Sequence, residues 1–112
     1  MMLSPEELTK LQFIYVTTTG RKSGLPREIE IWFVERDGKF YIFAEHFYKA
    51  NWVRNIQNDA RVQARLGKQA FSATARILDE KKEAKLWRET QRLCREKYGW
   101  GEGLPVELTP DD

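Results

Sequence analysis

The sequence contains little of what most catalytic and metal sites are built from. Its 112 residues include one cysteine, Cys94, and one histidine, His46. A lone cysteine excludes an intramolecular disulfide, and these two side chains cannot supply the ligand spacing of a usual metal site. The sequence also has no nucleophile elbow and no P-loop. We therefore expect no metal, and any redox or transfer chemistry must come from a bound cofactor.

Long apolar runs and a strong net charge are also missing. The longest apolar run is 40–44, and the first residues, MMLSPEEL, have neither the charged nor the apolar region of a signal peptide. Secretion and integral membrane association are therefore not expected, and a cytoplasmic location follows by default. The net charge is only +2, which disfavours a nucleic-acid-binding protein.

Large apolar side chains, in contrast, are plentiful. Hydrophobic residues make up 41% of the chain and aromatic residues 12%, with four tryptophans. The length predicts a single domain over 1–112, and a domain of this size buries only about 65% of the surface that its unfolded chain exposes. The surplus of apolar groups indicates a second burial surface, which is either a homo-oligomer interface or a ligand cleft.

Capping signals and helical spacing predict three helices. A capping box that begins at Ser4 indicates a short helix to about Leu11. The apolar residues of 49–59 recur at helical spacing and indicate a second helix. Asp79 is a good N-cap for the third helix, which we expect to reach about Lys97.

Alternation and turn signals predict five strands, most of them joined by hairpins. The run 27–36 alternates clearly and is joined to the next strand by Asp37-Gly38, a strong hairpin signal. A second hairpin turns at Gly67-Lys68, and the tail from Gly99 is expected to be an extended or partly mobile arm. The order of elements predicts an antiparallel α+β fold, plausibly a small barrel with flanking helices.

Glycine and basic residues gather in the turn 20–27, GRKSGLPR, which we call the basic turn. Gly20 and Gly24 permit backbone conformations that aim consecutive amides at an anion, and Ser23 adds a hydroxyl group. The basic side chains are Arg21, Lys22 and Arg27. The turn can therefore bind a phosphate. The alternative, a solvated hairpin turn that is basic only for solubility, is favoured on composition alone.

Other candidate residues have structural alternatives as well. Lys49, Trp52, Arg54 and Asn55 begin the helix in 49–59, where free amides favour anions. Alternatively, Asn51 is an ordinary N-cap residue of this helix and Trp52 is an ordinary core residue. Trp32 can line a pocket for a flat ring or pack in a core or dimer interface. His46 by default is a surface loop residue, and Cys94 a packing residue.

The run VTTTGRKSGLPREIEIWFVERDGKFYIFA, residues 16–44, resembles the opening of the deazaflavin (F420)-dependent nitroreductase family. That family belongs to the FMN- and F420-binding split β-barrels related to pyridoxamine phosphate oxidase. The resemblance continues through the helix start and the next strand and covers about 14–78. The residues that carry it there are Trp52, Asn55, Asn58 and Val62.

The resemblance implies a homodimeric split barrel with F420 or FMN in a groove between the barrel and its partner subunit. It implies an oxidoreductase that passes hydride to a small conjugated, quinone or nitro acceptor, without a catalytic acid or base that we can name. A flavin- or nucleotide-binding module without turnover is the alternative. By matching position, the cofactor-binding residues would be Arg21, Lys22, Ser23 and Gly24 at the phosphate, Pro26 and Arg27 in the groove, Glu30, Ile31 and Trp32 at the ring, and Ala44, Lys49, Trp52 and Asn55 opposite.

Two features depart from the family pattern. Glu30-Ile31 stands where the family has Pro-Leu, and the loop EHFYKA, 45–50, is shorter than its counterpart. A buried Glu30 would repel an electron-rich reduced ring unless it were paired, for which Arg27 and Arg65 are candidates.

Overall fold

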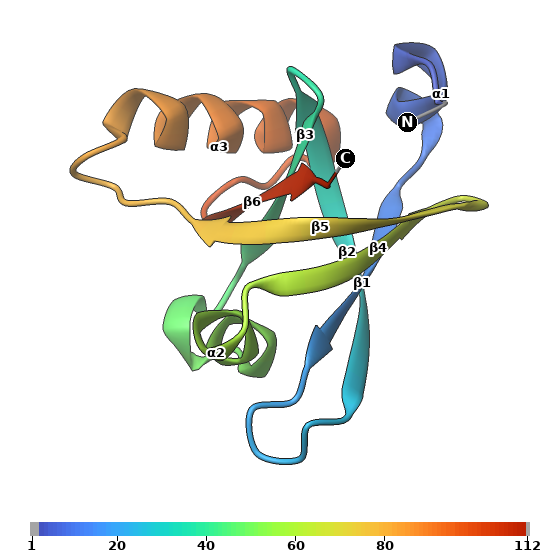
Figure 1. The fold of residues 1–112 in the computed structure, drawn as a ribbon. Coiled ribbons are helices and arrows are strands. Elements are labelled where there is room, and N and C mark those ends of the chain that lie inside the picture. Colours follow the sequence, from blue (N-terminus) through green and yellow to red (C-terminus); the bar gives the residue numbers. More distant parts are fainter. Residues whose placement is uncertain (1–2, 112) are drawn as a thin grey trace.

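The computed structural model describes residues 3–111, which form a closed barrel with flanking helices (Figure 1). All strand pairs are antiparallel, and the strands follow one another around the barrel in the order β1-β2-β3-β6-β5-β4. The α+β split-barrel prediction is therefore confirmed. The elements are α1 (Pro5–Lys10), β1 (Phe13–Thr19), β2 (Pro26–Arg36), β3 (Lys39–Ala44), the 3₁₀ helix η1 (Phe47–Lys49), α2 (Asn51–Asn58), β4 (Arg61–Leu66), β5 (Gln69–Ile77), α3 (Ala84–Tyr98) and β6 (Leu104–Pro110).

The barrel interior is filled by alternate residues of the strands. On β2, Phe33 is fully buried in this core and Ile29 and Ile31 are partly buried against it, in agreement with the alternation of 27–36. Each strand sends every second side chain inward, so the other face of β2 is left for Glu30 and Trp32. Two of the candidate ring contacts, Glu30 and Trp32, therefore lie outside the barrel, while Ile31 packs against its core.

A second core lies between the barrel and α3, which crosses above the sheet in Figure 1. Outward-facing Val34 and Tyr41 pack there with Trp87 and Cys94 of α3. Cys94 is fully buried, and burial raises the pKa of its thiol to about 11. The cysteine is therefore a packing residue with little thiolate at neutral pH, in agreement with its expected role.

The prediction of a C-terminal arm from Gly99 was wrong for the part that forms β6. This strand pairs with β3 on one side and β5 on the other, and Val106 and Leu108 are fully buried. Glu107 stands between these two residues and is also buried. A charged residue at this position interrupts the apolar pattern that would otherwise indicate a buried strand. The Glu107 carboxylate accepts hydrogen bonds from the hydroxyl of Tyr41 (2.9 Å) and the guanidinium of Arg76 (3.2 Å).

Helix boundaries agree with the sequence only in part. The capping box at Ser4 is present, with reciprocal bonds to Glu7. However, α3 begins at Ala84, because the Asp79 carboxylate accepts hydrogen bonds from the amides of residues 81 and 82 and closes a separate turn. Asn51 is not a cap: Ala50 occupies the N-cap position of α2 and Asn51 is its first helical residue.

Candidate functional site

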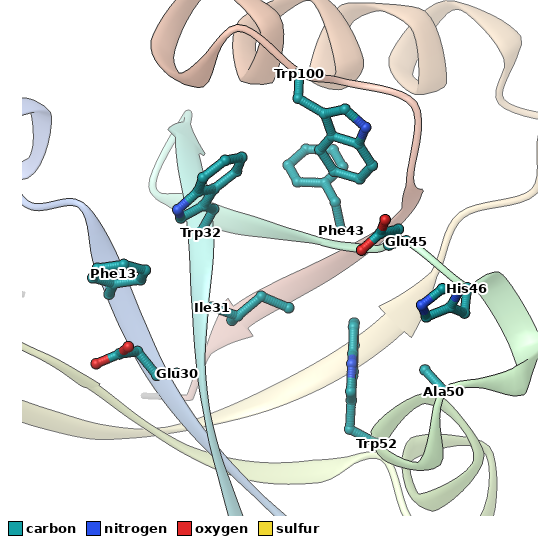
Figure 2. A pocket seen from close by; sticks show the side chains of 10 residues that line it. All are labelled: Phe13, Glu30, Ile31, Trp32, Phe43, Glu45, His46, Ala50, Trp52 and Trp100. Atoms are coloured by element: carbon teal, nitrogen blue, oxygen red, sulfur yellow. The ribbon is translucent and has the colours of Figure 1, made fainter.

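A cavity of about 590 Å³ lies beside β2, between the loop after β3, the start of α2 and the segment after α3 (Figure 2). This size is within the usual range of small-molecule sites. Its aromatic walls come from Phe13, Trp32, Phe43, Trp52 and Trp100. The remaining lining residues are Glu30, Ile31, Glu45, His46 and Ala50. We call it the aromatic cavity.

Trp32 is held in place by the end of α3. Its ring stacks on the Tyr98 ring with the centroids 4.5 Å apart and the planes 6° from parallel. The Tyr98 hydroxyl lies 2.7 Å from the carbonyl oxygen of Gln12 and 2.8 Å from that of Phe33. Trp100 then meets Trp32 edge-on at 6.4 Å. These contacts fix the orientation of one wall of the aromatic cavity.

The opposite wall belongs to α2. Trp52, half-buried, packs against both hydrophobic cores, and Ala50 lines the cavity at the helix start. No side chain caps this N-terminus. The first amides of α2 therefore keep their free hydrogen-bonding capacity beside the cavity, where the helix dipole favours negative charge.

Beyond α2 lies the basic turn, which is fastened to the helix by asparagines. The Oδ1 atom of Asn55 accepts hydrogen bonds from the backbone N–H and the Nη1 atom of Arg21, both at 3.1 Å. The Asn55 amide nitrogen donates to Thr18 at 3.1 Å, and Arg21 Nη2 donates to Asn51 at 3.4 Å. Because these acceptors are neutral amides, they position the Arg21 guanidinium without cancelling its charge.

The backbone of the basic turn supplies fewer free amides than the sequence suggested. The amide of Gly20 donates to the Leu25 carbonyl and that of Gly24 to the Gly20 carbonyl, both at 2.8 Å. The Leu25 amide donates to the Ser23 hydroxyl at 3.1 Å. Within 3–111, the amides of Lys22 and Ser23 make no backbone or side-chain hydrogen bond. An anion can therefore be bound by these two consecutive amides rather than by those of the glycines.

The structure brings together some of the predicted cofactor-binding residues. Glu30, Ile31, Trp32 and Trp52 line the aromatic cavity. Arg21 and Asn55 bond to one another but do not line it, and Asn55 is buried with its polar atoms already partnered. The other members lie apart from the cavity lining, with Gly24 and Pro26 on another hollow of about 330 Å³. These others are Lys22, Ser23, Arg27, Ala44 and Lys49.

Several lining residues were not predicted from sequence. Trp100 belonged to the segment expected to be an arm, and Phe13 precedes the part of the chain that resembles the family. Glu45 and His46 directly follow Ala44, which was predicted but does not line the cavity. Ala44 itself is buried.

Glu30 is exposed, so the concern about a buried carboxylate does not apply. Its partner is neither Arg27 nor Arg65: the hydroxyl group of Tyr15 donates a hydrogen bond to it. The guanidinium of Arg65 lies 4.2 Å from the centre of the Tyr15 ring. The bond to Glu30 raises the pKa of Tyr15, because loss of the proton would break the bond and place two negative charges together.

Two kinds of site are not found in the part of the chain that the structure describes. No group of three or more histidine, cysteine or acidic side chains within 3–111 could hold a metal ion. None of the helices in that range has both the length and the apolar character needed to cross a membrane.

Comparison with known proteins supports the fold and gives the family. HutZ, the heme storage protein from Vibrio cholerae, has 18% identity over 100% of this chain and 92% of its own, with a TM-score of 0.78. The F420-H2 dependent reductase FDR-A has 24% identity over 89% and 94%, with a TM-score of 0.67. A FAD-binding protein from Mesorhizobium loti has 17% identity over 100% and 95%, with a TM-score of 0.66. At these identities the structures establish a shared fold.

The family model of F420H(2)-dependent quinone reductases matches residues 4–106, nearly the whole chain. This match agrees with the resemblance carried by the basic turn and the strand after it, and with the expected cofactor class, F420 or FMN. The chain therefore belongs to the F420H2-dependent quinone reductase family.

Proposed function

We propose that this protein is a reductase that uses F420, or alternatively FMN, to transfer hydride to a small quinone, nitro or other conjugated acceptor. The observation that supports this most is the connection of the aromatic cavity to the basic turn through one short helix. Ala50 and Trp52 of the α2 region line the cavity, while Asn51 and Asn55 hold Arg21. A molecule with a flat ring and an anionic tail can use both.

The residues of the basic turn fit a phosphate. Lys22 and Ser23 offer two adjacent free amides, and Arg21 keeps its charge for an anion. The uncapped start of α2 adds a positive dipole end beside them. Lys22 and Arg27 are exposed and add long-range attraction. We propose that these groups hold the phosphate and tail of the cofactor.

The aromatic cavity fits a flat ring. When bound, the cofactor supplies the hydride, which its own ring chemistry makes available. The protein's part is to orient and shield: Ile31 presents an apolar surface, with Trp32 on one side of it and Trp52 on the other. Burying the reacting atoms between such walls excludes water and favours one orientation of donor and acceptor. We assign no catalytic acid or base.

We further propose that a second copy of the chain completes the site. Leu25 in the basic turn is 56% exposed, and Tyr48 and Phe47 in η1 are 48% and 38% exposed. Phe47 and Tyr48 lie between His46 and Ala50, which line the cavity. Large apolar side chains at the margin of a ligand site are suited to a subunit interface. The cytoplasmic location expected from the sequence stays a prediction.

Titration with oxidised F420 and with FMN, followed by their visible absorption and by tryptophan fluorescence, tests the binding step. We expect Arg21→Ala combined with Lys22→Ala to weaken binding at least tenfold, since charge-assisted hydrogen bonds are each worth roughly 1.5–3 kcal/mol. The matched control is Lys85→Ala combined with Arg88→Ala, which removes two exposed cations from α3.

The control variant should bind like the unchanged protein. Absence of binding of either cofactor at micromolar concentration would refute the proposal. Binding without oxidation of the reduced cofactor by any quinone or nitroaromatic would instead identify a non-catalytic binding module.

A further inference from the structure

The charged side chains around the aromatic cavity all have the same sign. Glu30 and Glu45 line it, while none of the lysines and arginines within 3–111 does. Figure 2 shows them on opposite sides of the open space, Glu30 beside Phe13 and Glu45 beside Phe43. The lining of the cavity is therefore acidic at two of its margins, although the chain as a whole carries a net charge of +2.

Neither carboxylate is neutralised by a direct ion pair in the described part of the chain. Glu30 accepts a hydrogen bond from the Tyr15 hydroxyl, an uncharged donor. The guanidinium of Arg65 stacks on the Tyr15 ring and donates a hydrogen bond to the Gly67 carbonyl, not to Glu30. Glu45 makes no salt bridge or side-chain hydrogen bond within 3–111, and it is exposed. Both side chains can therefore interact with a ligand.

The aromatic walls favour the same kind of ligand. The faces of Trp32, Trp52 and Trp100 carry negative electrostatic potential, which attracts cations as well as flat rings. Carboxylates at the edge of such walls strengthen this attraction for a positive group and oppose an anionic one. The aromatic cavity thus combines two independent sources of preference for positive charge.

Groups that attract anions lie at the other end of the site. Arg21 bonds to Asn51 of α2, and neither Arg21 nor the free amides of Lys22 and Ser23 belong to the cavity lining. The site is therefore polarised, with an anion-binding end for the cofactor tail and an acidic, aromatic end for the reacting partner. A cationic acceptor would also be attracted to an electron-rich reduced cofactor.

We propose that the aromatic cavity selects planar aromatic acceptors that carry positive charge, and discriminates against anionic acceptors of the same size. Glu30 and Glu45 determine this specificity. The inference rests on the proposed function in that it takes the acceptor to share this cavity of about 590 Å³ with the cofactor ring.

Binding of three bicyclic probes of nearly equal size tests the charge preference without cofactor or turnover. The probes are N-methylquinolinium, 1-methylnaphthalene and naphthalene-1-sulfonate, and their binding is followed by quenching of tryptophan fluorescence. We expect the affinity to fall in that order, and the affinity for the cation to decrease with added salt because exposed charges are screened.

Variants assign the preference to the two carboxylates. Glu30→Gln and Glu45→Gln should each reduce the affinity for N-methylquinolinium roughly two- to fivefold, the range found for exposed ion pairs, and leave that for 1-methylnaphthalene unchanged. Glu30→Gln keeps an oxygen that can accept the Tyr15 hydrogen bond. Glu80→Gln is the control, since Glu80 is exposed and outside the cavity lining.

Equal affinity for the cationic and neutral probes, or equal effects of Glu30→Gln and Glu80→Gln, would overturn the inference. Failure of the proposed function gives a different result, because F420H2 would then not be oxidised by any acceptor while the order of probe affinities remained.

Discussion

The substitution Asn51→Asp distinguishes the contribution of residue 51 to the stability of α2 from its contribution to cofactor binding at the basic turn. Asn51 accepts a hydrogen bond from Arg21 Nη2 at 3.4 Å through a neutral amide oxygen. An aspartate would accept the same bond but would add a negative charge next to the guanidinium. It would also stand at the first position of α2, where the helix dipole favours an acid. Stability and cofactor affinity should therefore change in opposite directions.

The magnitudes follow from this geometry. An acid in the first turn of an exposed helix contributes about 0.5 kcal/mol, or about 2 °C in the melting temperature of a domain of this size. Two unit charges about 4 Å apart interact by about 1 kcal/mol when water surrounds them, which Asn51 allows because it is exposed. Loss of that much attraction for a phosphate corresponds to about fivefold weaker binding.

Thermal denaturation and a fluorescence titration with F420 or FMN measure both effects. Asn58→Asp is the matched control, since Asn58 is the last residue of α2 and an acid there opposes the dipole. The control should be slightly less stable and bind the cofactor normally. If Asn51→Asp binds as tightly as the unchanged protein, the free charge of Arg21 has no part in holding the cofactor.

Three further changes test other parts of the structure. Leu108→Ala in β6 should cost about 3 kcal/mol of unfolding free energy in urea denaturation, because Leu108 is fully buried, whereas a mobile arm would tolerate it. Gly20→Ala should cost about 1–2 kcal/mol and weaken cofactor binding, since its Cβ would lie 2.6 Å from Ser23 Oγ and 3.2 Å from the Leu25 carbonyl; an unchanged melting temperature would contradict this. Burial lowers the pKa of Lys97 from 10.5 to about 8. Between those pH values the unfolded chain binds more protons than the folded one, so stability rises with pH. Lys97→Met should lose this rise, as denaturation curves at pH 7 and 10 will show.

Local patterns predicted the parts of the fold that depend on neighbouring residues. The alternation in β2 placed Ile31 inside the barrel and Trp32 outside, and the Asp37-Gly38 turn joined β2 to β3. The prediction of an arm from Gly99 was wrong because the glycines and prolines of this segment suggest irregular structure. The buried charge of Glu107 becomes intelligible only when Arg76 and Tyr41 are seen beside it.

The candidate site depended more on contacts between distant parts of the chain. The sequence identified the basic turn and the start of α2 separately, but not that Asn55 fastens Arg21, 34 positions away. Nor could it show that Trp32 stacks on Tyr98, because the register between β2 and α3 is set by packing of the whole domain. Glu30 was recognised as unusual, and the structure supplied its partner, Tyr15.

Anaerobic oxidation of the reduced cofactor by a small quinone such as menadione tests the central claim most directly. F420H2 and reduced FMN are each followed by absorption, with and without protein. We expect rapid, saturable oxidation of at least one cofactor that requires both protein and quinone, is strongly reduced in the Arg21→Ala, Lys22→Ala variant, and persists in the Lys85→Ala, Arg88→Ala control. Rates equal to those without protein, for both cofactors and under conditions where they bind, would contradict the assignment as a reductase.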